Sequence, residues 1–267
     1  MSQDDFEPID LFSMYMKVTG TPALEDAPCD DPALAGKKLG LVNGASWISL
    51  WTNYFGRKIL PGVKLLNAGN EAVQLNFMDA HKNGEPCPPQ VNINLFADYA
   101  EQLHTLFGVD AVLITCSTMN RAVGAVRERM AGYGVPVLQI DEAMMAAAVN
   151  REGKILVVAT HGPTVKSTQA LLLETAERIG KEVTFTGATV EEAFDLLGEG
   201  DIRGHNEVIA KAIRDAQARE AVDIVVLAQL SMTVFKLSYP DCEQTFGVPV
   251  LTSGETGFQR VGEILRG

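Results

Sequence analysis

Short apolar runs alternate with amphipathic stretches from Lys37 to the end of the chain. The runs are apolar at odd and even positions alike, which is typical of strands that are buried on both faces. The stretch QALLLETAERIGK instead has the 3.6-residue period of a helix that covers a sheet. The alternation predicts an α/β fold of doubly wound, Rossmann-like or flavodoxin-like parallel sheets, with strands at KLGLV, VKLLN, DAVLIT, VPVLQI, KILVVAT, EVTFTG, DIVVLAQ and VPVLTS.

Two short sequences recur along the chain with the same offset. The dipeptide Val-Asp begins predicted strands at residues 109–110 and 222–223, and GVPVL occurs at residues 134–138 and 247–251. Two matched features in the same strand order favour an internal duplication. We therefore expect two similar halves related by a pseudo-two-fold axis. Because ligands of such sheets bind at the carboxyl ends of the strands, the active site is expected in a cleft between the halves.

The pattern also predicts the boundaries of these parts. Residues 1–36 are acidic, contain the turn-forming stretches TGTP and EDAPCDDP, and are expected to form an N-terminal arm. Residues 37–150 are expected to form the first half and residues 151–267 the second, with the C-terminal segment able to pack back on the first half. The N-terminus lacks the pattern of a signal peptide, and no apolar run reaches the roughly 20 residues that span a bilayer, so we expect a cytoplasmic protein.

Charge and cysteine content narrow the choice of partners. The chain of 267 residues carries 22 basic and 34 acidic side chains, a net charge of −12, which disfavours binding to nucleic acid or to an anionic membrane. Small molecules or further copies of the chain are the expected partners. Its four cysteines lie far apart without a C-x-x-C pair, so neither a disulfide framework nor a zinc site is expected.

Small polar residues gather in the loops that follow the predicted strands. Any one of them could be an ordinary helix cap. Their concentration in corresponding loops of two related halves favours a binding site for a carboxylate, which neutral donors and helix N-termini can hold without an arginine. The candidates are Asn43, Ser117, Thr118, Thr160, Thr164 and Ser231.

Cys116 ends the buried run VDAVLIT and is the candidate with reactive chemistry. A free cysteine has a pKa of about 8.5, and a position just before a helix is expected to lower it. Such a side chain can accept a proton as thiolate or donate one as thiol. The alternative is that Cys116 is a small buried hydrophobe, as free cysteines often are.

The stretches LITCSTMN and ATHGPTVKS, in two halves of this kind, resemble the aspartate/glutamate racemase superfamily. This superfamily also contains hydantoin racemases, maleate isomerases and arylmalonate decarboxylases, and the resemblance covers the chain from about Lys37 onward. It implies catalysis without a cofactor or metal, a homo-oligomer, and two cysteines that face each other across the substrate. Cys116 matches the first of these cysteines.

The resemblance also suggests which residues bind substrate. Ser117 and Thr118 match the residues that bind a substrate carboxylate, Asn43 matches the polar residue of the first loop, and Thr160 and Thr164 match the corresponding loop of the second half. In VVLAQLSM, however, Gln229 stands where the second cysteine is expected.

Gln229 changes the expected mechanism because an amide has no usable pKa near neutrality. It can orient the substrate but cannot act as the second acid or base of a two-thiol racemase. Racemisation is still open if another group serves the opposite face, and His161, with an unperturbed pKa near 6.5, is the candidate. One thiol suffices for protonation after decarboxylation, or for addition to a double bond in cis–trans isomerisation.

We therefore expect a cofactor-independent racemase or isomerase that acts at the carbon next to a carboxylate of a small acid through Cys116. The alternatives are a one-thiol decarboxylase of a malonate-like acid and a non-catalytic carboxylate sensor. The resemblance does not fix the reaction, since arylmalonate decarboxylases retain the second-half cysteine rather than the first.

Overall fold

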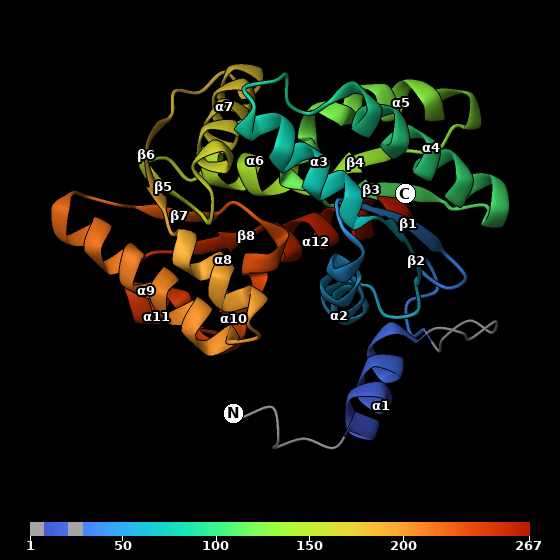
Figure 1. The fold of residues 1–267 in the computed structure, drawn as a ribbon, viewed down its shortest axis with the longest axis horizontal. Helices are drawn as coiled ribbons and strands as arrows, with labels where there is room; N and C mark the ends of the chain where they lie inside the picture. Colours follow the sequence, from blue (N-terminus) through green and yellow to red (C-terminus); the bar gives the residue numbers. More distant parts are fainter. Residues whose placement is uncertain (1–7, 21–28) are drawn as a thin grey trace. The chain divides into compact units, whose positions relative to one another are not determined.

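The computed structural model describes residues 8–20 and 29–267, which contain two four-stranded parallel sheets (Figure 1). The first sheet has the order β2-β1-β3-β4, and the second has the order β6-β5-β7-β8. The predicted α/β fold class and all eight predicted strands are confirmed. The strands are β1 (Lys38–Asn43), β2 (Lys64–Gly69), β3 (Ala111–Ile114), β4 (Val137–Gln139), β5 (Lys154–Ala159), β6 (Thr184–Thr189), β7 (Ile224–Leu227) and β8 (Val250–Thr252).

Helices connect the strands of each sheet. Those that follow the strands of the first sheet are α2 (Ser49–Ile59), α3 (Glu71–Lys82), α4 (Gln90–Phe107), α5 (Val123–Met130) and α6 (Glu142–Asn150). Those that follow the strands of the second are α7 (Gly162–Ile179), α8 (Glu191–Gly198), α9 (Ile202–Arg219), α10 (Phe235–Ser238), α11 (Cys242–Phe246) and α12 (Ser253–Arg266). Short 3₁₀ helices are η1 (Ser46–Ile48), η2 (Ser117–Ala122), η3 (Ala131–Tyr133) and η4 (Leu230–Val234).

Strand β5 shows why these runs are apolar at every position. Ile155 and Val157 pack into a core with Leu172 of α7. The alternate residue Leu156 packs into a second core with Ile209 of α9. Each of these side chains is almost fully buried, and burial of one such side chain contributes about 2 kcal/mol. Because helices cover both faces of the sheet, successive side chains of the strand both need to be apolar.

The two sheets repeat one another in topology and in detail. Asp110 comes just before β3, and its carboxylate accepts a hydrogen bond from the backbone N–H of Lys38 at 2.8 Å. Asp223 comes just before β7 and accepts the equivalent bond from Lys154 at 2.7 Å. Together with the identical strand orders, this shared detail supports the predicted duplication. The pseudo-two-fold axis and the cleft between the halves stay predictions.

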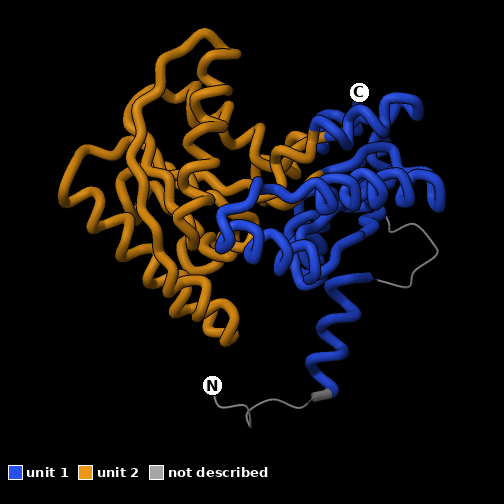
Figure 2. Tube along the Cα trace, turned by 45° about the horizontal axis from the view of Figure 1, so that its top comes forward, with its two compact units in different colours: residues 1–113, 124–137, 261–267 blue, residues 114–123, 138–260 orange. Residues whose placement is uncertain are grey.

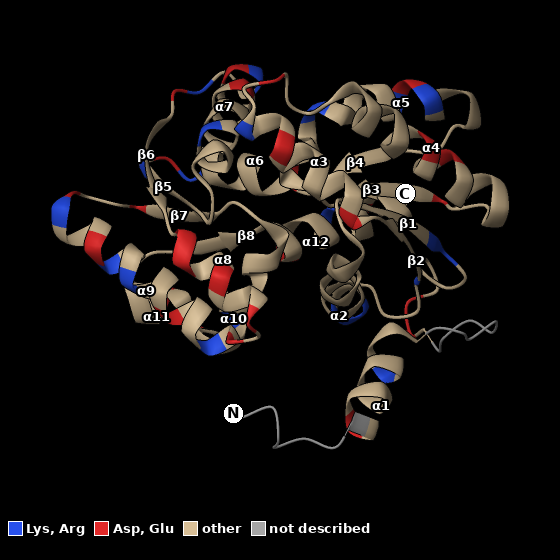
Figure 3. Ribbon diagram, in the orientation of Figure 1, with Lys and Arg blue, Asp and Glu red and all other residues tan. Residues whose placement is uncertain are grey.

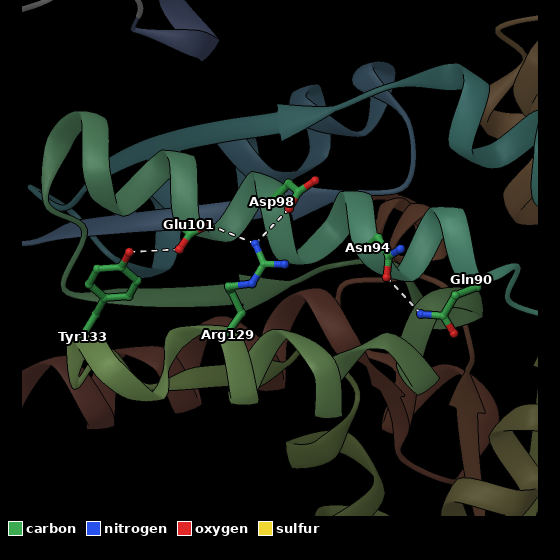
Figure 4. A network of polar contacts seen from close by, with 6 residues as sticks. All are labelled: Gln90, Asn94, Asp98, Glu101, Arg129 and Tyr133. Carbon is green, nitrogen blue, oxygen red and sulfur yellow. Dashed lines mark hydrogen bonds and ion pairs between the residues drawn. The ribbon is translucent and has the colours of Figure 1, made fainter.

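Helices α4 and α5 are joined at the surface by a polar network (Figure 4). The guanidinium group of Arg129 donates hydrogen bonds of 2.9 Å to Asp98 and to Glu101. The hydroxyl of Tyr133 donates a third bond, also of 2.9 Å, to Glu101. These hydrogen bonds hold the pKa of Glu101 below its usual range, so the network persists as an ion pair at neutral pH.

The chain forms two compact units (Figure 2). One contains residues up to 113 together with 124–137 and 261–267, and the other contains residues 114–123 and 138–260. The segment that carries Cys116 thus belongs to the same unit as the second sheet. The boundaries predicted from the sequence, at residues 36 and 150, stay predictions.

Part of the predicted N-terminal arm is a helix, α1 (Pro8–Thr19). Its end is tied to α2, since the guanidinium group of Arg57 donates a hydrogen bond of 2.6 Å to the carbonyl oxygen of Thr19. The rest of the arm includes residues 1–7 and 21–28, which lie outside the described part of the chain. Among the helices of the described part, none has the length and apolar character needed to cross a membrane.

Candidate active site

Cys116 lies at the end of β3, where the chain turns into η2. It is the N-cap residue of η2 and has an extended backbone, with φ −99° and ψ 110°. Its carbonyl oxygen accepts the backbone N–H of Met119 at 3.1 Å, and its Sγ lies 3.2 Å from Oγ1 of Thr118. The small residues after the strand thus form a tight turn that holds the thiol against a hydroxyl group.

Burial raises the pKa of the Cys116 thiol, and the charge of Asp141 raises it further. Hydrogen bonds from Thr118 and from the backbone N–H groups of Thr118 and Met119 act in the opposite direction, but they are smaller effects than desolvation. The expected lowering of this pKa is therefore wrong as a net effect, although the backbone N–H groups at the start of η2 do act in the expected direction. The reason is that desolvation of the thiol has a larger effect than the hydrogen bonds from this turn.

Gln229 occupies the equivalent position after β7. It is the N-cap residue of η4, and its carbonyl oxygen accepts the backbone N–H of Met232 at 3.0 Å, as Cys116 does with Met119. Its side-chain Oε1 accepts two hydrogen bonds from Thr160, from the backbone N at 2.8 Å and from Oγ1 at 2.9 Å. This pairing leaves Nε2 as the end of the amide that can donate to a ligand.

His161 and Thr164 begin helix α7. Thr164 is buried, and its backbone N–H donates to the carbonyl oxygen of His161 at 3.0 Å. The imidazole of His161 packs on the ring of Phe194 in α8, with 4.7 Å between ring centroids. Burial lowers the pKa of His161, although Glu191 and Asp195 of α8 act to raise it. Figure 3 shows acidic positions of α8 in red. The ring is therefore neutral at pH 7 and can accept a proton.

Asp141 is a residue of this region that the sequence analysis missed. It follows β4 and is only 3% exposed, and its Oδ1 accepts a hydrogen bond of 3.2 Å from Oγ of Ser117. Burial raises the pKa of Asp141 to about 7. An acidic pair such as Asp141-Glu142 before a helix is typical of an exposed helix N-terminus. Only its position after the predicted strand VPVLQI could have identified it.

Asn43 and Ser231 are held inside the protein. Asn43 is the last residue of β1, is fully buried, and donates a hydrogen bond of 2.9 Å from Nδ2 to Oδ1 of Asn67. Ser231 lies in η4 and is 5% exposed. Asn43 belongs to the first compact unit, whereas the other candidates belong to the second. The substrate-binding roles of all candidate residues stay predictions.

The described residues contain no group of three or more His, Cys, Asp or Glu side chains that could hold a metal ion. The hydrogen bonds join the candidates into pairs: Cys116 with Thr118, Ser117 with Asp141, and Thr160 with Gln229. Chemically, these pairs offer one thiol, one carboxyl of raised pKa and several neutral donors.

Residues 90–261 match the family model of the Asp/Glu/Hydantoin racemases, which is more than half of the chain. The chain belongs to this family. The predicted membership of the racemase superfamily is thereby confirmed, whereas the replacement of a second catalytic cysteine by Gln229 stays a prediction. Among curated proteins, none matches the chain.

Solved structures of racemases share the fold. The aspartate racemase of Picrophilus torridus is 16% identical, with a TM-score of 0.62 over 86% of this chain and 94% of that one. The glutamate racemase of Francisella tularensis, in complex with D-glutamate, is 17% identical, with a TM-score of 0.61 over 86% and 81%. An unliganded arylmalonate decarboxylase is 14% identical, with a TM-score of 0.53 over 86% and 93%. At these identities the similarity establishes the fold alone.

Proposed function

We propose that this protein is a cofactor-independent enzyme that acts at the carbon next to a carboxylate of a small acid, with Cys116 as the catalytic residue. The observation that carries the proposal is the difference between two equivalent positions. A thiol follows β3 and an amide follows β7, each as the N-cap residue of a 3₁₀ helix. Family membership supplies the reaction class, racemisation or isomerisation.

The raised pKa of Cys116 assigns its resting state. At neutral pH the side chain is a thiol, so its first available step is to donate a proton to a carbanion or enediolate. To remove a proton it first has to become a thiolate, which the hydroxyl of Thr118 stabilises as a donor at 3.2 Å. The site is thus better suited to proton donation than to proton removal.

The amide of Gln229 serves binding rather than proton transfer. Two hydrogen bonds from Thr160 fix its Oε1, so Nε2 is oriented as a neutral donor for a substrate carboxylate. The N-terminus of α7, which follows Thr160, adds the partial positive charge of an 18-residue helix. If the reaction is a racemisation, His161 serves the second face of the substrate, since its low pKa leaves it neutral and able to accept a proton.

Decarboxylation of a malonate-like acid is the second candidate. It is favoured by the combination of one protonated thiol with an amide that has no acid–base chemistry. Loss of carbon dioxide leaves an enediolate that needs a proton on one face only, and the neutral donors can stabilise its charge. The arylmalonate decarboxylase with the same fold is compatible with this reading.

Proton NMR in deuterated water separates these reactions. The protein is incubated with a panel of amino dicarboxylic acids, arylmalonates and cis-unsaturated diacids. Deuterium at the α-carbon of both enantiomers indicates racemisation, release of carbon dioxide with deuterium in the product indicates decarboxylation, and a changed double-bond geometry indicates isomerisation. Binding without any conversion contradicts the proposal and favours a carboxylate sensor. Cys87→Ala, which removes an exposed cysteine, is the matched control for Cys116→Ala.

We also propose that copies of the chain associate through α1. The helix exposes large apolar side chains over a broad face, with exposed fractions from 45% to 71%, whereas Asp10, Ser13 and Lys17 share the remaining face. Exposed apolar side chains gathered on one helix mark an interaction surface, and in a symmetric pair each copy covers the same side chains of the other. A second copy is therefore a sufficient partner for this surface, which consists of Ile9, Leu11, Phe12, Met14, Tyr15 and Met16.

A further inference from the structure

Asp141 lies where a capping residue is expected but does not cap its helix. It is the N-cap residue of α6, and an aspartate at such a position normally accepts a hydrogen bond from a backbone N–H of the first turn. In this structure its side chain makes no capping bond. Its carboxyl group instead contacts Oγ of Ser117, the residue that follows Cys116.

The surroundings of the carboxyl group favour its protonated form. Among the described residues, the hydroxyl of Ser117 donates a long hydrogen bond of 3.2 Å to the carboxyl group. Gln139 and Ser253, like Ser117, lie close enough for their side chains to lower the pKa of the carboxyl, although Gln139 Nε2 and Ser253 Oγ make no well-aligned hydrogen bond among the described residues, and desolvation outweighs all three. The nearby charge of Glu142 opposes ionisation as well. Desolvation of a buried carboxylate beside a second negative charge outweighs these donors, so the proton is held up to neutral pH.

The charge of Asp141 affects both residues at the end of β3. An ionised carboxylate only accepts hydrogen bonds, so the hydroxyl hydrogen of Ser117 has to point toward Asp141. A protonated carboxyl can donate its own hydrogen to Oγ of Ser117, which frees the serine hydrogen for another acceptor. The negative charge of Asp141 also makes loss of the proton from Cys116 harder.

We propose that Asp141 is a positioning residue whose proton controls this strand end. With the proton in place, Ser117 can donate to a substrate carboxylate and Cys116 can form its thiolate more readily. Without the proton, the carboxylate of Asp141 holds the hydroxyl hydrogen of Ser117, and its negative charge hinders formation of the Cys116 thiolate. The catalytic meaning of this control rests on the proposed function, but the control of the Cys116 thiol can be tested without any substrate.

The test is the pH profile of Cys116 alkylation by iodoacetamide, with peptide mass spectrometry to separate Cys116 from the other cysteines. The wild type is compared with Asp141→Asn, which keeps an oxygen for Ser117 but has no proton to lose. Only the thiolate reacts. Below about pH 6 Asp141 is neutral in the wild type, so the two rates are expected to agree. By pH 8.5 the variant is expected to react about threefold faster or more, because in the wild type the thiolate then has to form beside the negative charge of Asp141.

Ser117→Ala is the matched variant, since it removes the hydroxyl but keeps the carboxyl. It should retain a step from the ionisation of Asp141, moved to higher pH because the hydrogen bond from Ser117 lowers the pKa of that carboxyl. If Asp141→Asn does not fold, the wild-type profile alone decides, because ionisation of Asp141 should add a second step near pH 7 to the titration of the thiol. A rate ratio that is constant with pH, or a wild-type profile with one step, overturns the proposal. If no acid is converted but the pH-dependent ratio is found, the proposed function fails and the control by Asp141 stands.

Discussion

Replacement of Asp141 by asparagine should make the protein relatively more stable at high pH than at low pH. The folded protein holds the proton of this carboxyl up to a pKa of about 7, whereas the unfolded chain releases it near 3.9. Between these values the folded state binds more protons than the unfolded state. The wild type therefore loses stability as the pH rises through this window, and the loss is complete above pH 7.

The size of the effect follows from the difference between the pKa values of Asp141 in the folded and unfolded chain. Of the range from pH 4.5 to pH 8, about 2.5 pH units lie below the pKa of Asp141 in the folded protein. At 1.36 kcal/mol per unit, the free energy of unfolding of the wild type should fall by at most about 3 kcal/mol over this range. The asparagine variant has no proton to exchange and lacks this loss, while it can still accept the hydrogen bond from Ser117.

Urea unfolding of both proteins at the two pH values measures the effect. The quantity of interest is the difference between variant and wild type, because the titration of other groups cancels in it. Glu207→Gln, an exposed carboxylate of α9, is the control and should give nearly the same difference at both pH values. If the difference for Asp141→Asn is also independent of pH, or shifts in favour of the wild type at pH 8, the carboxyl does not hold a proton in the folded protein and the reasoning is refuted.

Three further predictions concern binding, the repeat and assembly. Thr160→Val keeps the backbone donor to Gln229 but removes the hydroxyl donor. Loss of this hydrogen bond should weaken substrate binding by about 1 kcal/mol, which raises KM roughly fivefold with little change in kcat in steady-state assays. An unchanged KM would show that Gln229 does not hold substrate. Asp110→Ala and Asp223→Ala each remove an acceptor for the first backbone N–H of a strand. Urea unfolding should show that each substitution lowers the free energy of unfolding by about 1 kcal/mol. Clearly unequal losses would argue against equivalent roles of the two aspartates. Phe12→Glu places a charge on the apolar surface of α1 and should shift the mass measured by light scattering toward the monomer; a wild type that is already monomeric contradicts assembly through α1.

The fold was predictable because its signals are local. Each strand is an uninterrupted apolar run, and the alternating contacts of Ile155 and Leu156 show that the pattern records burial on both faces. The duplication was visible because the Val-Asp and GVPVL matches share one offset, and Asp110 and Asp223 make the same backbone contact in each half.

The electrostatics of the site were less predictable because they depend on tertiary packing. Cys116 was located from its place after an apolar run, but the direction of its pKa shift was not, since burial exceeds the effect of the following helix. Asp141 is the second residue of an ordinary connection between β4, which ends at Gln139, and α6, which begins at Glu142. Its burial and its contact with Ser117 arise only when β3 and β4 lie side by side.

The central claim is that one thiol, Cys116, carries the chemistry. It is tested most directly by the stereochemistry of deuterium incorporation at the α-carbon of a converted acid, measured for the wild type, Cys116→Ala and Cys87→Ala. We expect the wild type and Cys87→Ala to deliver deuterium from the Cys116 face and Cys116→Ala to lose this delivery by at least two orders of magnitude, the usual contribution of a positioned acid. Incorporation at the wild-type rate in Cys116→Ala would contradict the claim.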